Sequence, residues 1–211
     1  MMNTADATAV LEAANLAAVR GRTRLFSDVA LRVAAHDALF VTGPNGSGKT
    51  TLLRILAGLT APAAGVVRFR GDAVSTFDSR LRDHVAFAGH LPALKDELTA
   101  SENLRALVAS AGTRVTHEQT VAALERVQLS RQRTLPARVL SQGQRRRIGL
   151  ARLTLVNKPL WILDEPTTAL DTDGITLLTS LLRRHLDTGG AAVVATHQRM
   201  DIAHAATLAL A

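Results

Sequence analysis

The stretch "GPNGSGKT", Gly43–Thr50, constrains the fold of this chain more than any other feature of the sequence. It matches the pattern G-x-x-x-x-G-K-[ST], in which the glycines let successive backbone N–H groups turn towards phosphate oxygens. The apolar run "ALFVT" before it is typical of a strand, and "TLLRILAGL" after it is typical of a helix, whose N-terminus favours an anion. The alternative is a glycine turn before a buried helix. Together, the strand, loop and helix predict an α/β protein that binds phosphate groups.

The polar side chains of this loop predict a site for ATP and Mg²⁺. Lys49, which we also count among the catalytic residues, is expected to bridge the terminal phosphates of ATP. The hydroxyl of Thr50 is expected to bind Mg²⁺. The candidate nucleotide-binding residues of the loop are Gly43, Pro44, Asn45, Gly46, Ser47, Gly48, Lys49, Thr50 and Thr51.

A second apolar run, "LWILDE" at residues 160–165, ends in two carboxylates. Open α/β sheets place ligands at the carboxyl ends of their strands, so Asp164 is expected to join the Mg²⁺ site. A carboxylate beside the metal aspartate can accept a proton from an attacking water, which makes Glu165 the candidate catalytic base. The alternative is that the sequence "DEP" only caps a turn.

Short apolar and β-branched runs recur along the chain, and helical patterns follow several of them. They predict strands within residues 11–16, 28–33, 38–43, 66–71, 84–89, 160–165 and 191–197. Residues 92 to about 157 differ, because apolar spacing there is helical and no run indicates a strand. We therefore expect a single domain over 1–211, with an α/β core over 10–90 and 158–211 and a helical insertion over about 91–157.

The amino-acid composition limits which binding partners and which cellular compartment suit this chain. The chain has 211 residues, a net charge of +7 and no cysteine, so disulfides and thiolate metal sites are excluded. The basic balance favours a polyanionic partner, but 3% aromatic residues and no tyrosine disfavour single-stranded nucleic acid. The start, "MMNTADATAV", does not resemble a signal peptide, and no window is long and apolar enough to span a membrane. The chain is expected to be neither exported nor integral to a membrane.

The stretch "LSQGQRRR", residues 140–147, predicts a second anion site. Ser141 can donate a hydroxyl, Gly143 allows close approach of a ligand to the backbone, and the helix that begins there adds N–H donors. The alternative is an N-capped helix in which Arg146 and Arg147 form a solvent-exposed face.

Four ordered motifs, "GPNGSGKTT", "LSQGQRRRIGLAR", "LWILDEPTTALD" and "VVATH", resemble those of ATP-binding cassette (ABC) ATPases over nearly the whole chain from Leu11. The resemblance implies a P-loop NTPase fold of the ABC type, with a mixed sheet core, an inserted helical subdomain and an N-terminal antiparallel β region. It also implies a head-to-tail homodimer. In such a dimer, Ser141 and Gly143, in the position of the family's LSGGQ signature, close over ATP bound to the other subunit. Gln142 replaces the first glycine of that signature.

Further residues are assigned through the same resemblance. His197 stands where the family has a catalytic switch histidine near the γ-phosphate, and Asp171 stands in the loop at the dimer interface. His90 replaces the glutamine that senses Mg²⁺ and contacts the membrane partner, so it is counted with the metal site. Arg20 replaces the tyrosine that stacks on adenine, and an arginine plane can stack there through a cation–π contact.

These departures, with Leu25, Phe26 and "LTASENL" at residues 98–104, resemble the ATPase subunit of the haem exporter of cytochrome c maturation, the CcmA family. That family usually reads "LSAGQ" where this chain reads "LSQGQ". The resemblance implies an ATP-hydrolysing translocase subunit, peripheral on the cytoplasmic face of the inner membrane, with integral membrane subunits as partners and no nucleic acid. Alternatives are the ATPase of another small-molecule ABC exporter and a soluble ABC clamp on nucleic acid or ribosomes. A small kinase would leave the second and third motifs unexplained.

Overall fold

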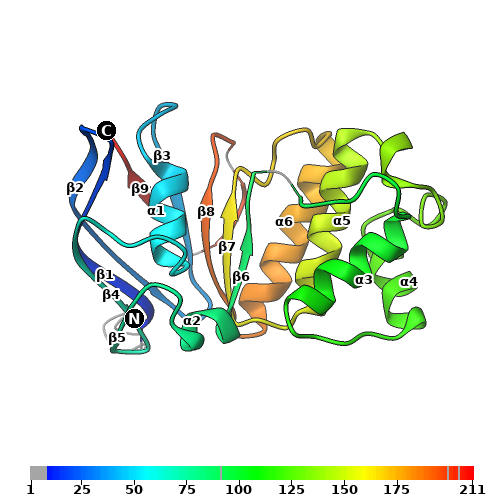
Figure 1. Ribbon diagram of the computed structural model, residues 1–211, viewed down its shortest axis with the longest axis horizontal. Helices are drawn as coiled ribbons and strands as arrows, with labels where there is room; N and C mark the ends of the chain where they lie inside the picture. Colours follow the sequence, from blue (N-terminus) through cyan, green and yellow to red (C-terminus); the bar gives the residue numbers. More distant parts are fainter. Residues whose placement is uncertain (1–8, 91, 199, 204) are drawn as a thin grey trace. The chain divides into compact units, whose positions relative to one another are not determined.

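The computed structural model describes residues 9–90, 92–198, 200–203 and 205–211. The chain folds into two compact units, which are described separately below. The first contains residues up to 87 together with 158–165 and 182–211, and the second contains residues 88–157 and 166–181 (Figure 1). Residues 1–8 lie outside the described residues. They begin the predicted single domain and make up most of the N-terminal stretch that does not resemble a signal peptide.

The N-terminal part of the first unit is an antiparallel sheet with strand order β2-β1-β4-β5. β1 and β2 form a hairpin that turns at Gly21, where φ is 62°. Burial along β1 alternates at Leu11 and Ala13 and, after a register shift, again at Leu16 and Ala18, which places these side chains in the core. The sequence indicated three of these strands but not the short β5. The strands are β1 (Ala9–Arg20), β2 (Thr23–Ala34), β4 (Ala64–Phe69) and β5 (Asp72–Val74).

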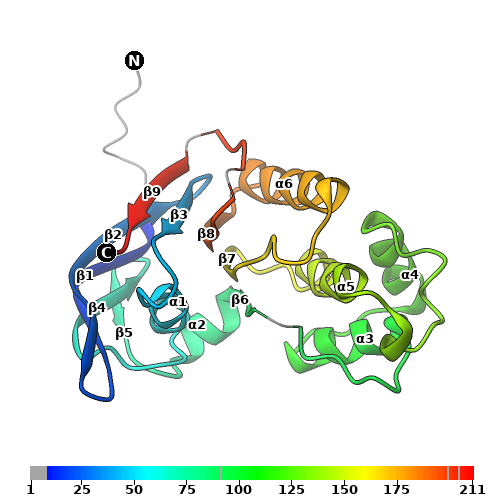
Figure 2. The ribbon, with the colours of Figure 1, turned by 90° about the horizontal axis from the view of Figure 1, so that it is seen from above.

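The other sheet of the first unit has the strand order β6-β7-β8-β3-β9, and its ladders from β7 to β9 are parallel (Figure 2). Every residue of β7 and β8 is buried, which explains their uninterrupted apolar sequences. β3 and β7 both pair with β8 and point the same way, so the residues after Thr42 and Asp164 emerge at the same edge. The strands are β3 (Ala38–Thr42), β6 (Val85–Ala88), β7 (Leu160–Asp164), β8 (Ala191–Ala195) and β9 (Ala205–Ala209).

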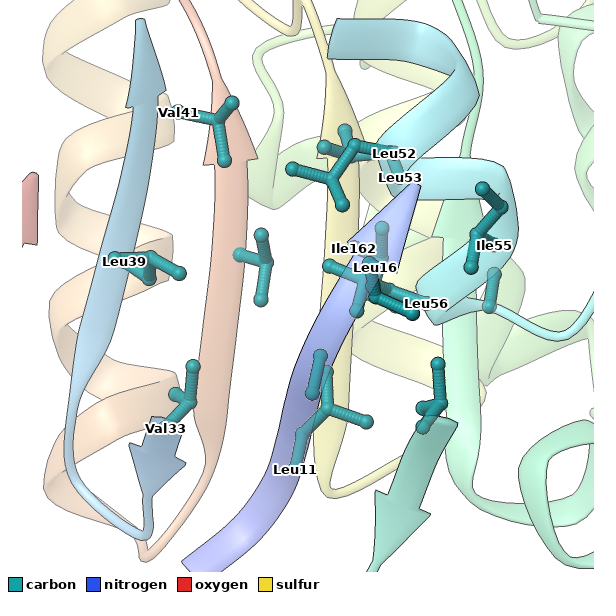
Figure 3. Packing of buried hydrophobic residues seen from close by; sticks show 14 of the residues in the cluster. Leu11, Leu16, Val33, Leu39, Val41, Leu52, Leu53, Ile55, Leu56 and Ile162 are labelled. Carbon is teal, nitrogen blue, oxygen red and sulfur yellow. The ribbon is translucent and has the colours of Figure 1, made fainter. Parts of the chain in front are cut away.

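Helix α1 (Lys49–Leu56) connects the two sheets of the first unit, because it contacts β1 of one and β7 and β8 of the other. Its apolar side chains Leu52, Leu53 and Leu56 are fully buried in one hydrophobic cluster with residues of both sheets (Figure 3). Burying three leucines stabilises the fold by roughly 1.5–3 kcal/mol each. The helix that carries the phosphate loop is therefore fixed at the centre of this unit's core.

A short helix, α2 (Ser79–His84), was not predicted from the sequence. Asp78 caps it by accepting hydrogen bonds from the backbone N–H and the guanidinium of Arg80. These bonds to Arg80 lower the pKa of Asp78 to about 2. Because α2 ends at His84, the predicted strand at residues 84–89 begins one residue later, as β6.

The second unit contains three complete helices, a 3-10 turn at Ala137–Val139 and the first part of α6. Each of the three complete helices begins with a capping box. The capping side chains are Thr99, Thr116 and Ser141. The helices contact one another pairwise, as Figure 2 shows. They are α3 (Ala100–Ser110), α4 (His117–Arg126) and α5 (Gln142–Leu155); α6 (Thr172–Asp187) has residues in both units. In the part of the chain that the structure describes, no helix could cross a membrane.

His185, near the end of α6, is part of the packing of the first unit. Its ring stacks on Trp161 with the ring centres 4.0 Å apart, and its Nε2 donates to the carbonyl of Ala191 at 3.1 Å. Burial of the ring lowers the pKa of His185 below its ordinary value of 6.5.

We predict that His185 makes the stability of the protein depend on pH. Since its pKa is lower in the folded than in the unfolded state, the unfolded chain binds more protons. The contribution of neutral His185 is therefore complete above about pH 6.5, the pKa of an unfolded histidine, and is lost as the pH falls below it. Denaturant titrations at several pH values should show this loss in the parent and in the exposed control His117→Gln. An equal loss in His185→Phe, which keeps the stacked ring, would contradict this assignment.

Candidate nucleotide site

The phosphate loop follows β3 and precedes α1, as the sequence predicts. At Gly43 φ is 142°, and a Cβ atom there would lie 2.3 Å from the carbonyl oxygen of Leu210. At Gly46 φ is 90°, and a Cβ atom would meet nothing within 4 Å. Gly43 is therefore required by close packing, whereas Gly46 is required by its backbone conformation and leaves open space above the loop.

Lys49 is buried, and its ammonium group lies over the loop. Nζ donates to the carbonyl oxygens of Gly43 at 2.8 Å and of Pro44 at 3.0 Å. The hydroxyl of Ser47 is also buried and has no hydrogen-bond partner among the described residues. A buried cation and an unsatisfied hydroxyl beside an open turn fit the phosphates of a nucleotide.

Thr50 and Asp164 come together although 114 residues separate them in the chain. The Thr50 hydroxyl donates to Oδ2 of Asp164 at 2.9 Å, and Asp164 is only 2% exposed. Hydroxyl and carboxylate oxygens are ligands that suit Mg²⁺. The residues predicted to hold this ion therefore fit it chemically.

Glu165 and His197 also lie close together, at the ends of the neighbouring strands β7 and β8. Nε2 of His197 is 3.5 Å from Oε1 of Glu165. The backbone N–H of Glu165 donates to the carbonyl of Ala195 at 2.9 Å, and its φ of 46° lies in the left-handed region. Such backbone strain is frequent at functional sites, because the surrounding structure must hold it in place.

One cavity of about 240 Å³ in the first unit unites most of the candidate nucleotide residues. Arg20, at the end of β1, lines it together with both carboxylates. Leu25 of β2 was not predicted as a site residue. It follows Arg24, which pairs with Val19 next to Arg20, so the hairpin register brings it to the cavity. The lining residues are Arg20, Leu25, Asn45, Gly46, Gly48, Lys49, Thr50, Thr51, Asp164 and Glu165.

A second cavity, of about 540 Å³, lies in the second unit around the start of α5. Ser141 accepts a hydrogen bond from the Gln144 backbone at 3.2 Å, while its own N–H donates to the Gln144 side chain at 3.0 Å. The alternative interpretation of Ser141 as an N-cap is thus correct, but its hydroxyl proton can still be donated to a ligand. A Cβ atom on Gly143 would lie 2.8 Å from the carbonyl oxygen of Ala169, so a larger residue would displace that loop.

The expectation that Arg146 and Arg147 form a solvent-exposed face is wrong, because both are less than 10% exposed. Arg147 donates to the carboxylate of Asp171 at 2.8 Å and to the side chain of Gln128 at 2.6 Å. The pKa of Asp171 is lowered by the Gly174 N–H and by the Arg147 guanidinium. The sequence of a charged helix does not show which of its side chains bind carbonyl and carboxylate groups of other segments.

His90 is exposed and belongs to the second unit, whereas Thr50 and Asp164 belong to the first. Its carbonyl oxygen accepts a hydrogen bond from Arg146 at 2.5 Å. No described group of three or more histidine or acidic side chains could hold a metal ion. The metal-sensing role expected for His90 therefore stays a prediction.

Comparison with known proteins gives the class of this chain. Residues 26–168 match the family model described as "ABC transporter". A "Cytochrome c biogenesis ATP-binding export protein CcmA" of Nitrosomonas europaea is 46% identical over 90% of both chains. The protein of that name from Pseudomonas aeruginosa is 47% identical, over 92% of this chain and 95% of its own.

A solved structure of an ATP-binding cassette, described as the dimer of a post-hydrolysis state bound to ADP and Pi, is 26% identical. Its TM-score is 0.76, with 89% of this chain and 88% of that chain covered. The chain therefore belongs to the ABC transporter family and, within it, to the CcmA group of ATP-binding export proteins. The predicted fold class and the predicted nucleotide-binding ATPase activity are confirmed. Members of this family act as dimers with membrane partners.

Proposed function

We propose that this chain is the ATP-hydrolysing subunit of a haem exporter that serves cytochrome c biogenesis. The names of its relatives support the pathway, and the chemistry of the first cavity supports the reaction. The observation that carries the proposal is that one cavity contains the phosphate loop, Asp164 and Glu165 together. It brings a phosphate cradle, a metal site and a base within reach of one nucleotide.

In the proposed reaction, the loop N–H groups and Lys49 bind the β- and γ-phosphates of ATP. Thr50 and Asp164 would hold Mg²⁺, which when bound neutralises charge on the phosphates. Glu165 accepts a proton from the water whose oxygen attacks the γ-phosphorus, and the bond to the β-phosphate oxygen breaks to release ADP. His197, next to Glu165, donates a hydrogen bond to the transferred phosphoryl group.

A second copy of the chain completes the site in this proposal. The cavity around Ser141 supports it, because a hydroxyl, a helix N-terminus and a close backbone turn form an anion site apart from the phosphate loop. Two chains paired head to tail would each close this cavity over the nucleotide of the other. ATP then stabilises the pair, and hydrolysis removes that contribution.

The proposed place of the dimer is the cytoplasmic face of the inner membrane, as a peripheral protein bound to integral membrane subunits. The expected contact surface is the region of residues 90–110, which contains His90 and the N-terminus of α3. No nucleic acid is needed for this function.

We predict that Lys49→Ala, which removes the ammonium group from the phosphate loop, abolishes the function in cells of the source organism. Haem staining should show that c-type cytochromes are lost while b-type haem remains. The control Lys158→Ala removes only a half-buried ammonium group bound to the carbonyl of Asp83, so it should behave as the parent. Normal c-type cytochromes in Lys49→Ala would instead favour another small-molecule exporter. Sedimentation of the chain that is sensitive to nuclease rather than to detergent would favour the soluble clamp.

A further inference from the structure

Two consecutive arginines at the start of α5 bind a segment that precedes α3. This segment, called here the His90 segment, consists of residues 89–90 and 92–98. We propose that Arg145 and Arg146 are positioning residues that couple the His90 segment to Ser141 and Gly143. The inference rests on the proposed function, in which these two residues complete the nucleotide site of a second copy.

Arg146 holds the N-terminal end of the His90 segment. Its guanidinium is buried and donates to the carbonyl oxygens of Gly89 at 2.9 Å and of His90 at 2.5 Å. It also donates to the carbonyl of Pro166 at 3.3 Å, in the residue that follows Glu165. A planar guanidinium has donors on three nitrogen atoms, so it can bind three carbonyls from two backbone segments at once, whereas the donors of a lysine share one nitrogen.

Arg145 holds the other end of the same segment. Its guanidinium lies 2.8 Å from the carboxylate of Asp96, and the carbonyl of Asp96 accepts a hydrogen bond from the Arg138 backbone at 3.0 Å. Both arginines lie within two turns of Ser141, so both ends of the segment are tied to the same stretch of α5.

The C-terminal part of the segment, around Lys95 and Leu98, is itself held in shape by Asn103 of α3. This side chain is 2% exposed and donates to the carbonyls of Lys95, Leu98 and Thr99, while its oxygen accepts from the Lys95 backbone at 2.8 Å. A buried amide with all its partners fixes the loop that it joins. This part of the His90 segment is therefore fixed to the start of α3.

These contacts define a physical connection inside the second unit. A membrane partner that displaces His90 would move the two carbonyls bound to Arg146, and α5 would move with them as a rigid helix. The N-terminus of α5 carries Ser141 and Gly143, so the connection links partner contact to the anion site. Through Pro166 the same guanidinium also holds the chain next to the proposed catalytic base.

The connection can be measured directly, because the chain contains no cysteine. Spin labels on Ala93→Cys and Gln142→Cys, both exposed positions, report the distance between the His90 segment and the start of α5. We expect a narrow distance distribution in this parent and a broader one after Arg146→Gln. Arg146→Lys should fall between the two, since it keeps a charged donor. The exposed control Arg133→Gln, which removes only a local bond to Ser130, should leave the distribution narrow.

Turnover provides the second measurement. Arg146→Gln should lower kcat roughly 2- to 30-fold, the usual range for a broken coupling contact, while KM for ATP stays within about twofold of the parent. A merely structural role would instead lower the amount of folded protein and leave kcat per folded site unchanged. Should Arg146→Gln fail to fold, Asp96→Asn is the substitute, because it breaks only the exposed pair with Arg145.

The label distances and the turnover separate a failure of the coupling role from a failure of the proposed function. Distances and kcat that match the parent in Arg146→Gln, or in its substitute, overturn the coupling role. A parent chain that does not hydrolyse ATP refutes the proposed function, and the label distances still decide whether the arginines tie the segment to α5. Broader distances with reduced kcat and an unchanged KM support the inference.

Discussion

Glu165→Gln is expected to retain ATP binding and to lose about 10²- to 10⁴-fold in hydrolysis, the usual contribution of a general base. Glutamine has nearly the shape of glutamate and fits the same turn after β7, so the cavity should remain intact. It cannot accept a proton from water, however. Equilibrium titration with ATP and phosphate-release assays on the same preparation measure the two effects separately.

The matched control for this experiment is Glu125→Gln, an exposed carboxylate on α4 that should leave both quantities unchanged. If ATP accumulates without being hydrolysed, Glu165→Gln should also form dimers when ATP is added, which light scattering detects. Hydrolysis at a rate near that of the parent would refute the role of Glu165. A variant that remains monomeric with ATP bound would refute the composite site.

Ser141→Asp is expected to abolish hydrolysis without weakening ATP binding to a single chain. Aspartate caps a helix as well as serine does, so α5 should keep its N-terminus. In the proposed dimer its carboxylate would face the γ-phosphate of the other copy. Like charges across an interface cost several kcal/mol, so hydrolysis should fall by roughly 10²-fold or more.

Thr116→Asp is a close control, because Thr116 caps α4 through the same capping-box arrangement. It should hydrolyse ATP as the parent does. In a background of Glu165→Gln, adding Ser141→Asp should also remove the ATP-dependent dimer. Equal loss of ATP binding and hydrolysis in Ser141→Asp would mean that Ser141 does not act on the nucleotide of another chain.

The parts of the fold that local sequence determines could be predicted. The strand, glycine loop and helix around Gly43–Thr50 follow from neighbouring residues alone, and so does the buried strand that delivers Asp164. β9 could not be found in this way. Its sequence "AATLA" is mostly alanine, which has a low strand propensity, and its pairing with β3 joins residues far apart in the chain. α2 was missed for a related reason, because it depends on a single capping aspartate and covers six residues.

The same distinction between local and long-range determinants applies to the residues of the candidate site. Motif spacing predicted most of the residues that line the first cavity, because each motif lies at the end of a recognisable strand or helix. Burial of Arg146 and Arg147 could not be predicted, since it depends on carbonyl and carboxylate groups contributed by other segments. Leu25 shows the same limit, because only the register of the β1–β2 hairpin brings it beside the nucleotide cavity.

The left-handed backbone conformation at Glu165 lowers the stability of the fold at a residue that the proposed reaction requires. Any residue other than glycine loses folding free energy in this conformation, on the order of 1 kcal/mol. Glycine would relieve that loss but would remove the carboxylate. Selection for thermal tolerance and selection for activity therefore oppose each other at this one position, so stabilising substitutions should be sought elsewhere in the chain.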